Sequence, residues 1–456
     1  MSRYTAATDA DQQAMLDAIG VGSLDELFAD IPAGVRLQRE LDLPDGQSEQ
    51  EVYEHLAALA ARNRHTESEV TFLGAGMYDH YVPSLIDTLL SRSEFLTPYT
   101  PYQPEISQGG LQVMFEFQTA ISELTGLPVS HASVYEGPSA VAAAGYLAKL
   151  ETKRTKLVAS RGLHPHSRAA LRTHAAGYGM TVEEVPLTGE GATDVAALAA
   201  AIDDDTAAVF VQQPNFLGTV EELGELVEVG KRTGALLVCA ADPLPLAILR
   251  SPGELGVDVC VGEGQTLGNR LDFGGPSFGF FAAQERFIRK LPGRIAGETR
   301  DVDGRRGFVL TLQTREQHIR REKATHNICT AQALNALAGV VYLSWLGKRG
   351  AVELGELMLQ RTHYARQTLG LEAINPGPVV REFAVRVPDL DGLFERARAA
   401  GVNPGYRLAR DYPEYGDGLL VAITERRTKA QIDQLAELVS GDPGGRFERD
   451  HEEVRA

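Results

Sequence analysis

The fold of this chain is decided by TFLGAGMYDHYVPSL (residues 71–85), FLTPYTPYQPEISQGGLQVMFEFQTAISELTGL (95–127) and SVYEGPSAVAAAG (133–145). In the second segment apolar residues recur at helical spacing from Leu111, and a glycine and a proline follow, so an amphipathic helix ends at Gly126. In the third, Gly137-Pro138-Ser139 opens an alanine-rich helix that can pack closely on its neighbours. These segments predict the start of a large packed domain.

Short apolar runs bounded by turn residues follow these helices. They are Lys156–Ser160, Ala207–Gln212, Leu236–Ala241, Val257–Val261 and Phe278–Ala282. Helical patterns at Thr193–Ile202 and Gly224–Thr233 separate several of them. The alternation of strand and helix predicts an α/β domain whose mainly parallel sheet is covered by helices on both faces.

The sequence predicts three parts: a helical N-terminal arm (1–70), a large α/β domain (71–330) and a small C-terminal α+β domain (331–456). In the arm, helices are expected at Thr8–Ile19, from Ser23 and at Glu49–Ala61. Ser23 and Glu26 have the spacing of a capping box. The arm is expected to pack on a neighbouring domain or chain. The small domain is expected to contain helices Ala331–Leu346 and Ala351–Leu369 and strands Glu382–Val387 and Leu419–Thr424.

Composition excludes several classes of function. The 456 residues carry a formal net charge of −18, which disfavours binding to nucleic acid because its phosphates would be repelled. No apolar run is long enough to span a membrane, and the N-terminus has no apolar core like that of a signal peptide. Cys239, Cys260 and Cys329 are widely spaced and form no CxxC pattern, so we expect buried, reduced thiols in a cytoplasmic protein.

Ligands of parallel α/β sheets bind beyond the carboxyl ends of the strands. Asp242 lies there, directly after the expected strand Leu236–Ala241, and is a candidate to line a cleft. An alternative is that Asp242-Pro243 forms a turn before a helix. His164 and His166 flank a proline, but no third ligand has suitable spacing, so we expect a capping or surface role and no metal site.

The three opening segments and REKATHNICTAQALNAL (321–337) resemble the P-proteins of the glycine cleavage system, in particular the alpha chains of the two-chain bacterial form. The resemblance covers most of the chain, although the family usually has serine where this chain has His326. It implies an aminotransferase-like fold, that of fold type I pyridoxal-phosphate (PLP) enzymes. It also implies that, with a beta chain, the protein decarboxylates glycine and transfers the aminomethyl group to the lipoyl arm of H-protein.

The resemblance makes the absence of one residue informative. Enzymes of this fold carry the Schiff-base lysine at the exit of the strand after the aspartate, yet no lysine lies between Asp242 and Lys290. The lost position is placed near Gln265 and Thr266. Without an ε-amine no Schiff base can form. The expectation is therefore that this chain holds no catalytic residue of its own and that PLP is bound covalently by the beta chain, in an α2β2 assembly.

Other residues are candidates for a site shared between chains. In related folds a Thr-x-Asn-like segment reaches the phosphate of the neighbour's cofactor, and Thr325 and Asn327 lie at an equivalent point; alternatively they cap a helix starting near Ile328. A proline-stiffened loop with Tyr99, Tyr102 and Gln103 is expected to line a cleft, ordinary loop packing being the alternative. Two other functions stay open: a self-sufficient PLP decarboxylase or transaminase, and a non-catalytic scaffold or regulatory subunit.

Overall fold

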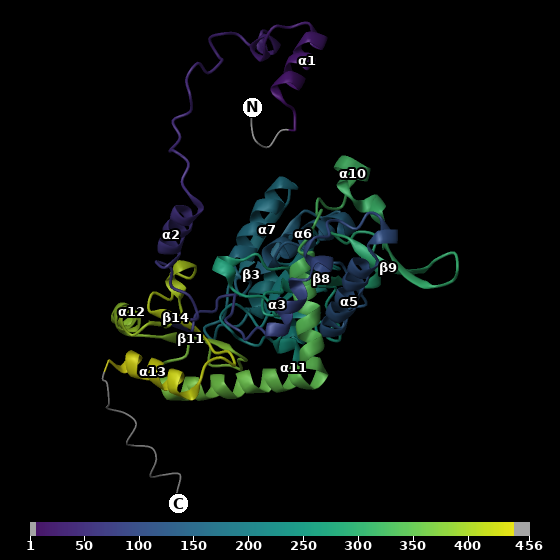
Figure 1. The fold of residues 1–456 in the computed structure, drawn as a ribbon. Coiled ribbons are helices and arrows are strands. Elements are labelled where there is room, and N and C mark those ends of the chain that lie inside the picture. Colours follow the sequence, from purple (N-terminus) through teal and green to yellow (C-terminus); the bar gives the residue numbers. More distant parts are fainter. Residues whose placement is uncertain (1–5, 442–456) are drawn as a thin grey trace, which may run out of the picture. The chain divides into compact units, whose positions relative to one another are not determined.

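The structure is a computed structural model that describes residues 6–441 (Figure 1). The chain divides into two compact units, with the boundary in the sequence between Arg64 and His65. The first unit contains helices α1 (Asp9–Ile19) and α2 (Glu49–Ala60). Thr8 and Ser48 are the N-caps of these helices, and each belongs to a complete capping box. Both helices confirm the sequence prediction.

The expected helix at Ser23 is only a 3-10 helix, η1 (Leu24–Phe28). Ser23 makes no capping bond to the backbone. The Glu26 carboxylate instead accepts a hydrogen bond from the Gly22 N–H at 3.2 Å, outside the helix. The capping box predicted at this point was therefore wrong.

In the second unit a seven-stranded sheet has the order β2-β8-β7-β6-β5-β3-β4. The pairs within the run β7-β6-β5-β3-β4 are parallel, and β8 is antiparallel to both of its neighbours, so the prediction of a mainly parallel sheet is confirmed. The strands are β2 (Val129–Ser130), β3 (Lys156–Ser160), β4 (Thr181–Val185), β5 (Thr206–Gln213), β6 (Leu236–Ala241), β7 (Val259–Glu263) and β8 (Gly279–Ala283).

Alternate residues of each strand enter different cores, because successive side chains point to opposite faces of a sheet. On β5, Val209 and Val211 join one buried cluster and Phe210 joins the other. Burying each such side chain contributes about 1.5–3 kcal/mol. The helices are α5 (Gln108–Thr125), α8 (Val195–Ala201) and α9 (Leu223–Gly230) on the first face, and α6 (Gly137–Thr152) and α7 (Pro165–Gly177) on the second. Helices therefore cover both faces, as expected.

Three strands of five or six residues were not foreseen, besides the two-residue strands. The outer strand β4 carries Glu183 and Glu184 and is only partly buried, so its sequence lacks the apolar run of a central strand. Strands β9 (Ile295–Arg300) and β10 (Arg306–Thr311) pair antiparallel as a hairpin, whose connecting loop extends away from the sheet in Figure 1. Charged residues in both strands hide the alternation of this hairpin.

Helix α11 (Ala333–Leu369) contacts α5 at one end and α13 (Lys429–Ser440) at the other, as Figure 1 shows. Gly347 has φ 61° and breaks it, which matches the two helices expected from the sequence. Beside it lies an antiparallel sheet in the order β11-β14-β13. Its elements are β11 (Glu382–Arg386), β13 (Tyr406–Arg407), β14 (Gly418–Ala422) and the helix α12 (Leu390–Ala399).

The remaining elements are short. Strand β1 (Val70–Thr71) pairs in parallel with β12 (Val402–Asn403). None of the helices in residues 6–441 combines the length and apolar character that a membrane crossing needs. The others are α3 (Ser84–Leu90), α4 (Ser93–Leu96), α10 (Gln317–Arg320), η2 (Pro104–Ile106), η3 (Pro245–Ala247), η4 (Asp272–Gly274), η5 (Glu285–Phe287), η6 (Gln313–Arg315), η7 (Arg321–Lys323) and η8 (Leu408–Arg410).

The cysteine prediction was right for two residues and wrong for one. Cys239 and Cys260 are buried free thiols that face each other on β6 and β7. Cys329 is exposed, because it lies in the segment before α11 rather than in the sheet. The exposed Cys329 also has a pKa below the ordinary value of a thiol, chiefly because the Arg294 guanidinium bonds it.

Candidate functional site

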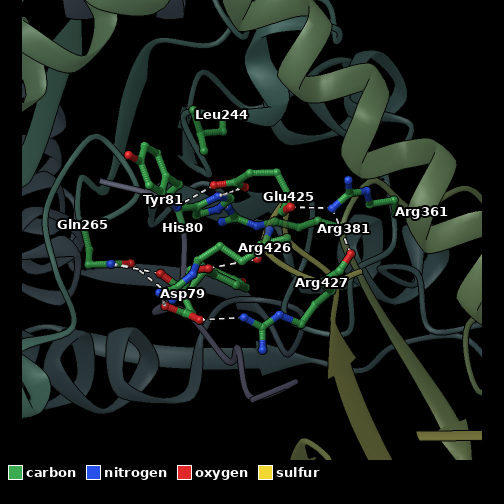
Figure 2. A network of polar contacts seen from close by, with 12 residues as sticks. Asp79, His80, Tyr81, Leu244, Gln265, Arg361, Arg381, Glu425, Arg426 and Arg427 are labelled. Carbon is green, nitrogen blue, oxygen red and sulfur yellow. Dashed lines mark hydrogen bonds and ion pairs between the residues drawn. The ribbon is translucent and has the colours of Figure 1, made fainter. Parts of the chain in front are cut away.

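The carboxyl ends of β6 and β7 bring Asp242 and Gln265 into one largely buried polar network. Figure 2 shows Gln265 pointing toward the segment that carries Asp79 and His80. Parallel neighbours end at the same edge of a sheet, which is why two residues 23 positions apart in sequence meet there. The other members come from the loop after β1, from α11 and from the end of the small sheet where β11 begins and β14 ends. We call this set the strand-exit network; it comprises Tyr78, Asp79, His80, Tyr81, Asp242, Gln265, Arg361, Arg381, Glu382, Glu425, Arg426 and Arg427.

Gln265 is one of the two residues near which the sequence analysis places the lost lysine. Its side chain is 1% exposed and bonds the backbone of Tyr78 in both directions, accepting from the N–H at 2.9 Å and donating to the carbonyl at 3.1 Å. It also donates to the Asn269 carbonyl at 2.9 Å. Thr266 is equally buried, and its hydroxyl has no partner among the described residues. The neutral amide of Gln265 therefore fixes the loop that follows β1.

Asp242 is paired with a cation from the small sheet. The Arg381 guanidinium donates to the Asp242 carboxylate and to Nε2 of His80, and it stacks 3.5 Å from the ring centroid of Tyr78. The side chain of Arg381 is 2% exposed, and that of Asp242 is 17% exposed. Asp242 also accepts a long bond from the Leu244 N–H at 3.4 Å, so it forms the turn expected as the alternative and a buried ion pair as well.

A second carboxylate of the network, Glu382, lies on β11 and is buried. It accepts hydrogen bonds from the Tyr78 hydroxyl at 2.7 Å and from the Ala75 N–H at 2.7 Å. Burial raises the pKa of Glu382 to about 7, against the lowering effect of these two donors and of Arg381. Glu382 therefore changes its protonation near neutral pH.

The imidazole of His80 is bonded at both nitrogens. Because Arg381 donates to Nε2, Nδ1 carries the proton and donates to Glu425 at 2.7 Å. Two further arginines close the network, since Arg426 and Arg427 both bond the carboxylate of Asp79, at 2.5 and 2.9 Å. The network thus holds the loop after β1, the exits of β6 and β7, and the segment after β14 together.

A further carboxylate, outside the strand-exit network, lies at the N-terminus of α6. Glu263, the last residue of β7, accepts hydrogen bonds from the Gly137 N–H at 2.9 Å, the Gln265 N–H at 3.1 Å and the Ser277 hydroxyl at 2.5 Å. Burial raises the pKa of Glu263, and these donors oppose the rise. Helix N-termini bind anions through such free N–H groups. Here the anion is a side chain of the protein itself, with Glu136 as a further cap bonded to the Ser139 N–H at 3.0 Å.

His164 and His166 lie at the start of α7. His164 caps α7, accepting from the His166 N–H through Nδ1 at 3.1 Å, while its Nε2 bonds the Ala75 carbonyl at 2.9 Å. Burial lowers the pKa of His164 to about 4. No group of three or more metal-ligating side chains occurs within residues 6–441. The expected capping role is confirmed.

The residues predicted to reach a partner lie away from helix starts. The Thr325 N–H donates to the Arg315 carbonyl at 3.1 Å, and Asn327 is exposed. Because α11 begins only at Ala333, the alternative that Thr325 and Asn327 cap a helix near Ile328 is wrong.

The expected cleft loop is exposed. Tyr99 is 73% and Tyr102 45% exposed, and Gln103 precedes η2. The Tyr102 hydroxyl accepts from Arg294 at 2.7 Å, which fixes this loop beside Glu316 and Cys329, the other partners of Arg294. Whether these tyrosines line a cleft shared with a second chain stays a prediction.

Sequence reasoning missed Arg381, Glu382 and Glu263. A signal was present, because Arg381-Glu382 places two charges at the start of an apolar strand and Glu263 ends another. Buried charges in such positions are rarely found without a partner. The identity of their partners came only from the folded chain.

The mainly parallel sheet with helices on both faces places the chain in the α/β class, and its fold matches that of PLP-dependent enzymes. The chain aligns with 90% coverage, a TM-score of 0.68 and 13% identity to the glutamate decarboxylase of Lactobacillus brevis, a likeness of fold alone. It aligns with 96% coverage, a TM-score of 0.87 and 41% identity to the whole chain of a glycine decarboxylase (P-protein) of the glycine cleavage system, crystallised in inhibitor-bound form.

The model of the glycine cleavage system P-protein family matches residues 2–439, and the chain belongs to that family. It is 49% identical over 439 residues to a probable glycine dehydrogenase (decarboxylating) subunit 1 of Geobacillus thermodenitrificans, with 95% of this chain and 98% of the relative covered. The protein of that name from Carboxydothermus hydrogenoformans is 48% identical over 443 residues, with 96% of this chain and 100% of the relative covered. The resemblance inferred from the sequence is confirmed.

Proposed function

We propose that this chain is the alpha subunit of a two-chain glycine cleavage P-protein, and that it acts only with a beta subunit. The assembled enzyme decarboxylates glycine with PLP and passes the aminomethyl group to the lipoyl arm of H-protein in the cytoplasm. The observation that carries the proposal is the family match over residues 2–439, together with relatives named subunit 1 that this chain covers almost completely. A subunit 1 implies a second chain.

The proposal places covalent PLP on the beta subunit. Its first support is that the sequence has no lysine between Asp242 and Lys290, while Lys290 lies beyond β8 in an ion pair with Glu151. Gln265, at the position of the lost lysine, is held by three hydrogen bonds and has no amine to offer.

Charge gives a second support. PLP brings a phosphate and, when its ring nitrogen is protonated, a cation. In this chain Glu263 holds the N-terminus of α6, where a phosphate would be repelled, and Arg381 already pairs with Asp242. These residues do not fit the cofactor, so no catalytic step is assigned to this chain through it.

The role proposed for the alpha subunit is to complete an α2β2 assembly. Its exposed tyrosines Tyr99 and Tyr102, with Gln103, would shape the cleft, and Thr325 and Asn327 would donate to the phosphate of the partner's PLP. The exposure of Asn327 and Tyr99 supports a role toward a second chain, because neither side chain is consumed by the core.

Purification of this chain with and without the beta subunit tests the proposal. Borohydride reduction followed by peptide mapping should find pyridoxyl-lysine only in beta, and glycine–bicarbonate exchange should need both chains. Stoichiometric pyridoxyl-lysine in this chain would establish the self-sufficient enzyme instead. Full exchange by beta alone would leave this chain a scaffold or regulator.

The variant Thr325→Ala/Asn327→Ala tests the finer assignment. A lost hydrogen bond to a charged group costs about 1.5–3 kcal/mol, so PLP retention by the complex should weaken by roughly tenfold or more. The melting temperature of the free chain should change little because no helix begins at these residues. Unchanged PLP affinity would remove both residues from the site. A matched control is Thr173→Ala, on an exposed part of α7.

A further inference from the structure

A second buried polar cluster lies outside the strand-exit network, and its donors are not all matched. Four segments meet there. The Ala132 N–H donates to the Arg294 carbonyl at 2.8 Å, and the Arg315 guanidinium donates to the Gly293 carbonyl at 3.0 Å. A Cβ on Gly293, which has φ 75°, would lie 3.5 Å from Cγ of the His131 ring. The cluster, called here the two-histidine cluster, comprises His131, Arg294, Arg315, Glu316 and His326.

Both imidazoles of this cluster have a fixed tautomer. Nδ1 of His131 accepts from the Ser133 N–H at 2.8 Å, and Nδ1 of His326 accepts from the Ile328 N–H at 3.2 Å. A neutral imidazole whose Nδ1 accepts carries its proton on Nε2. Burial is the main cause that lowers the pKa of His131 to about 3 and that of His326 to about 4, so both rings are neutral at pH 7.

The two Nε2–H groups are buried and have no acceptor among the described residues. His131 has no exposed surface at all. An unmatched buried donor is costly, and native proteins rarely leave one without a partner, protein or otherwise. Arg294 adds a third such group, since its Nε–H is also buried without an acceptor. Three N–H donors from two neighbouring histidines and an arginine thus call for an acceptor.

The cluster has an excess of positive charge, as a binding site for an anion requires. Arg315 is 6% exposed and donates to the carbonyls of Leu291, Gly293 and Leu312, and it bonds no carboxylate among the described residues. The single buried carboxylate, Glu316, lies 3.3 Å from Arg294.

Two buried guanidinium groups therefore share one carboxylate, and the neutral histidines add no charge. A lone positive charge in the interior is unfavourable unless an anion joins it. His318 also bonds Glu316, at 3.4 Å, but its side chain is 49% exposed and faces solvent.

We propose that the two-histidine cluster binds a small oxyanion, of the phosphate, bicarbonate or carboxylate class, between Nε2 of His131, Nε2 of His326 and Arg294. An oxyanion carries hydrogen-bond acceptors and at least one negative charge. It would therefore satisfy the unpartnered N–H donors and neutralise the excess positive charge. A water molecule would meet the donors but not the charge. This site is independent of covalent PLP and needs no partner chain.

The test titrates the purified full chain with inorganic phosphate, bicarbonate and acetate by calorimetry, in chloride buffer of constant ionic strength. The variant His131→Asn/His326→Asn is the sharpest probe. An asparagine oxygen can still accept from the N–H two residues on, so the local turn is kept while the Nε2–H donors are removed. Each lost bond to an anion should weaken binding about tenfold, and the double variant about a hundredfold.

His174→Asn on the exposed side of α7 is the matched control and should bind as the parent does. Binding of phosphate alone, or of the two carboxylate-type anions alone, would support the site and define its class. Equal affinity in the double variant would overturn it, as would the absence of heat with all three anions. A crystal structure in phosphate that shows water alone between the Nε2 atoms would do the same.

Discussion

The strand-exit network and the two-histidine cluster are both buried and charged, but they differ in how their donors are matched. In the network, His80 is bonded at both ring nitrogens, and Arg381 meets a carboxylate. In the cluster, His131 and His326 are each bonded at one nitrogen only. In the network, Nε of Arg381 and Nε of Arg427 also lack a partner, so the contrast rests on the imidazoles and on the excess positive charge of the cluster.

The difference separates two uses of buried charge. Paired charges and fully bonded imidazoles hold parts of the chain together, and this is the state of His80, Asp242 and Asp79 in the strand-exit network. Unmatched donors lower stability unless something else satisfies them. The position of a site in the fold is therefore a weaker guide to ligand binding in this chain than the state of its hydrogen bonds.

Arg381→Met should break the network most severely. It leaves Asp242 and Nε2 of His80 without their cation, and breaking a buried ion pair costs about 3–5 kcal/mol. Denaturant unfolding of the full chain measures the loss. The control Arg349→Met removes an exposed pair with Glu353 and should cost about 0.5 kcal/mol or less. Equal losses in the two variants would mean that the strand exits are not held by charge.

Glu382 should make stability depend on pH. The pKa of Glu382 in the folded chain, about 7, lies above the ordinary value of 4.5, so its contribution to the free energy of unfolding is full below pH 4.5 and is lost as pH rises through 7. The loss amounts to about 3 kcal/mol, at about 1.4 kcal/mol for each pKa unit.

Unfolding free energies of the parent and of Glu382→Gln, measured from pH 5 to 8, give the difference curve that isolates this group. The difference should change across this range because glutamine does not titrate. A flat difference curve would show that Glu382 is ionised throughout and that its donors outweigh its burial.

The smallest effect is expected from the two-histidine cluster. In phosphate the parent should gain unfolding free energy over anion-free buffer, and His131→Asn/His326→Asn should not, because it lacks the Nε2–H donors. In anion-free buffer the double variant should lose only the packing of the two rings, since the donors that it removes have no acceptor there. An equal gain of the two proteins in phosphate would erase the contrast with the strand-exit network.

The sequence determined the class of fold. Lys156–Ser160 and Leu236–Ala241 were identified with the bounds of β3 and β6, since buried parallel strands are continuous apolar runs between turn residues. Apolar periodicity predicted the helix that contains Leu111, which is α5. The two helices expected on either side of Gly347 match α11, which is broken at that glycine. The long similar blocks indicated the family, and the primary sequence alone shows that no lysine lies between Asp242 and Lys290.

The tertiary structure alone decided which charges meet. Arg381 lies 139 residues from Asp242 in sequence, and Arg294 lies 22 residues from Glu316, so no local spacing reports either pair. The same holds for the hairpin β9–β10 and for outer strand β4, whose charged residues mask their periodicity. Periodicity records only whether a side chain faces the core. The acceptor that a buried donor finds depends on which distant segment packs against it, and only the folded chain fixes that.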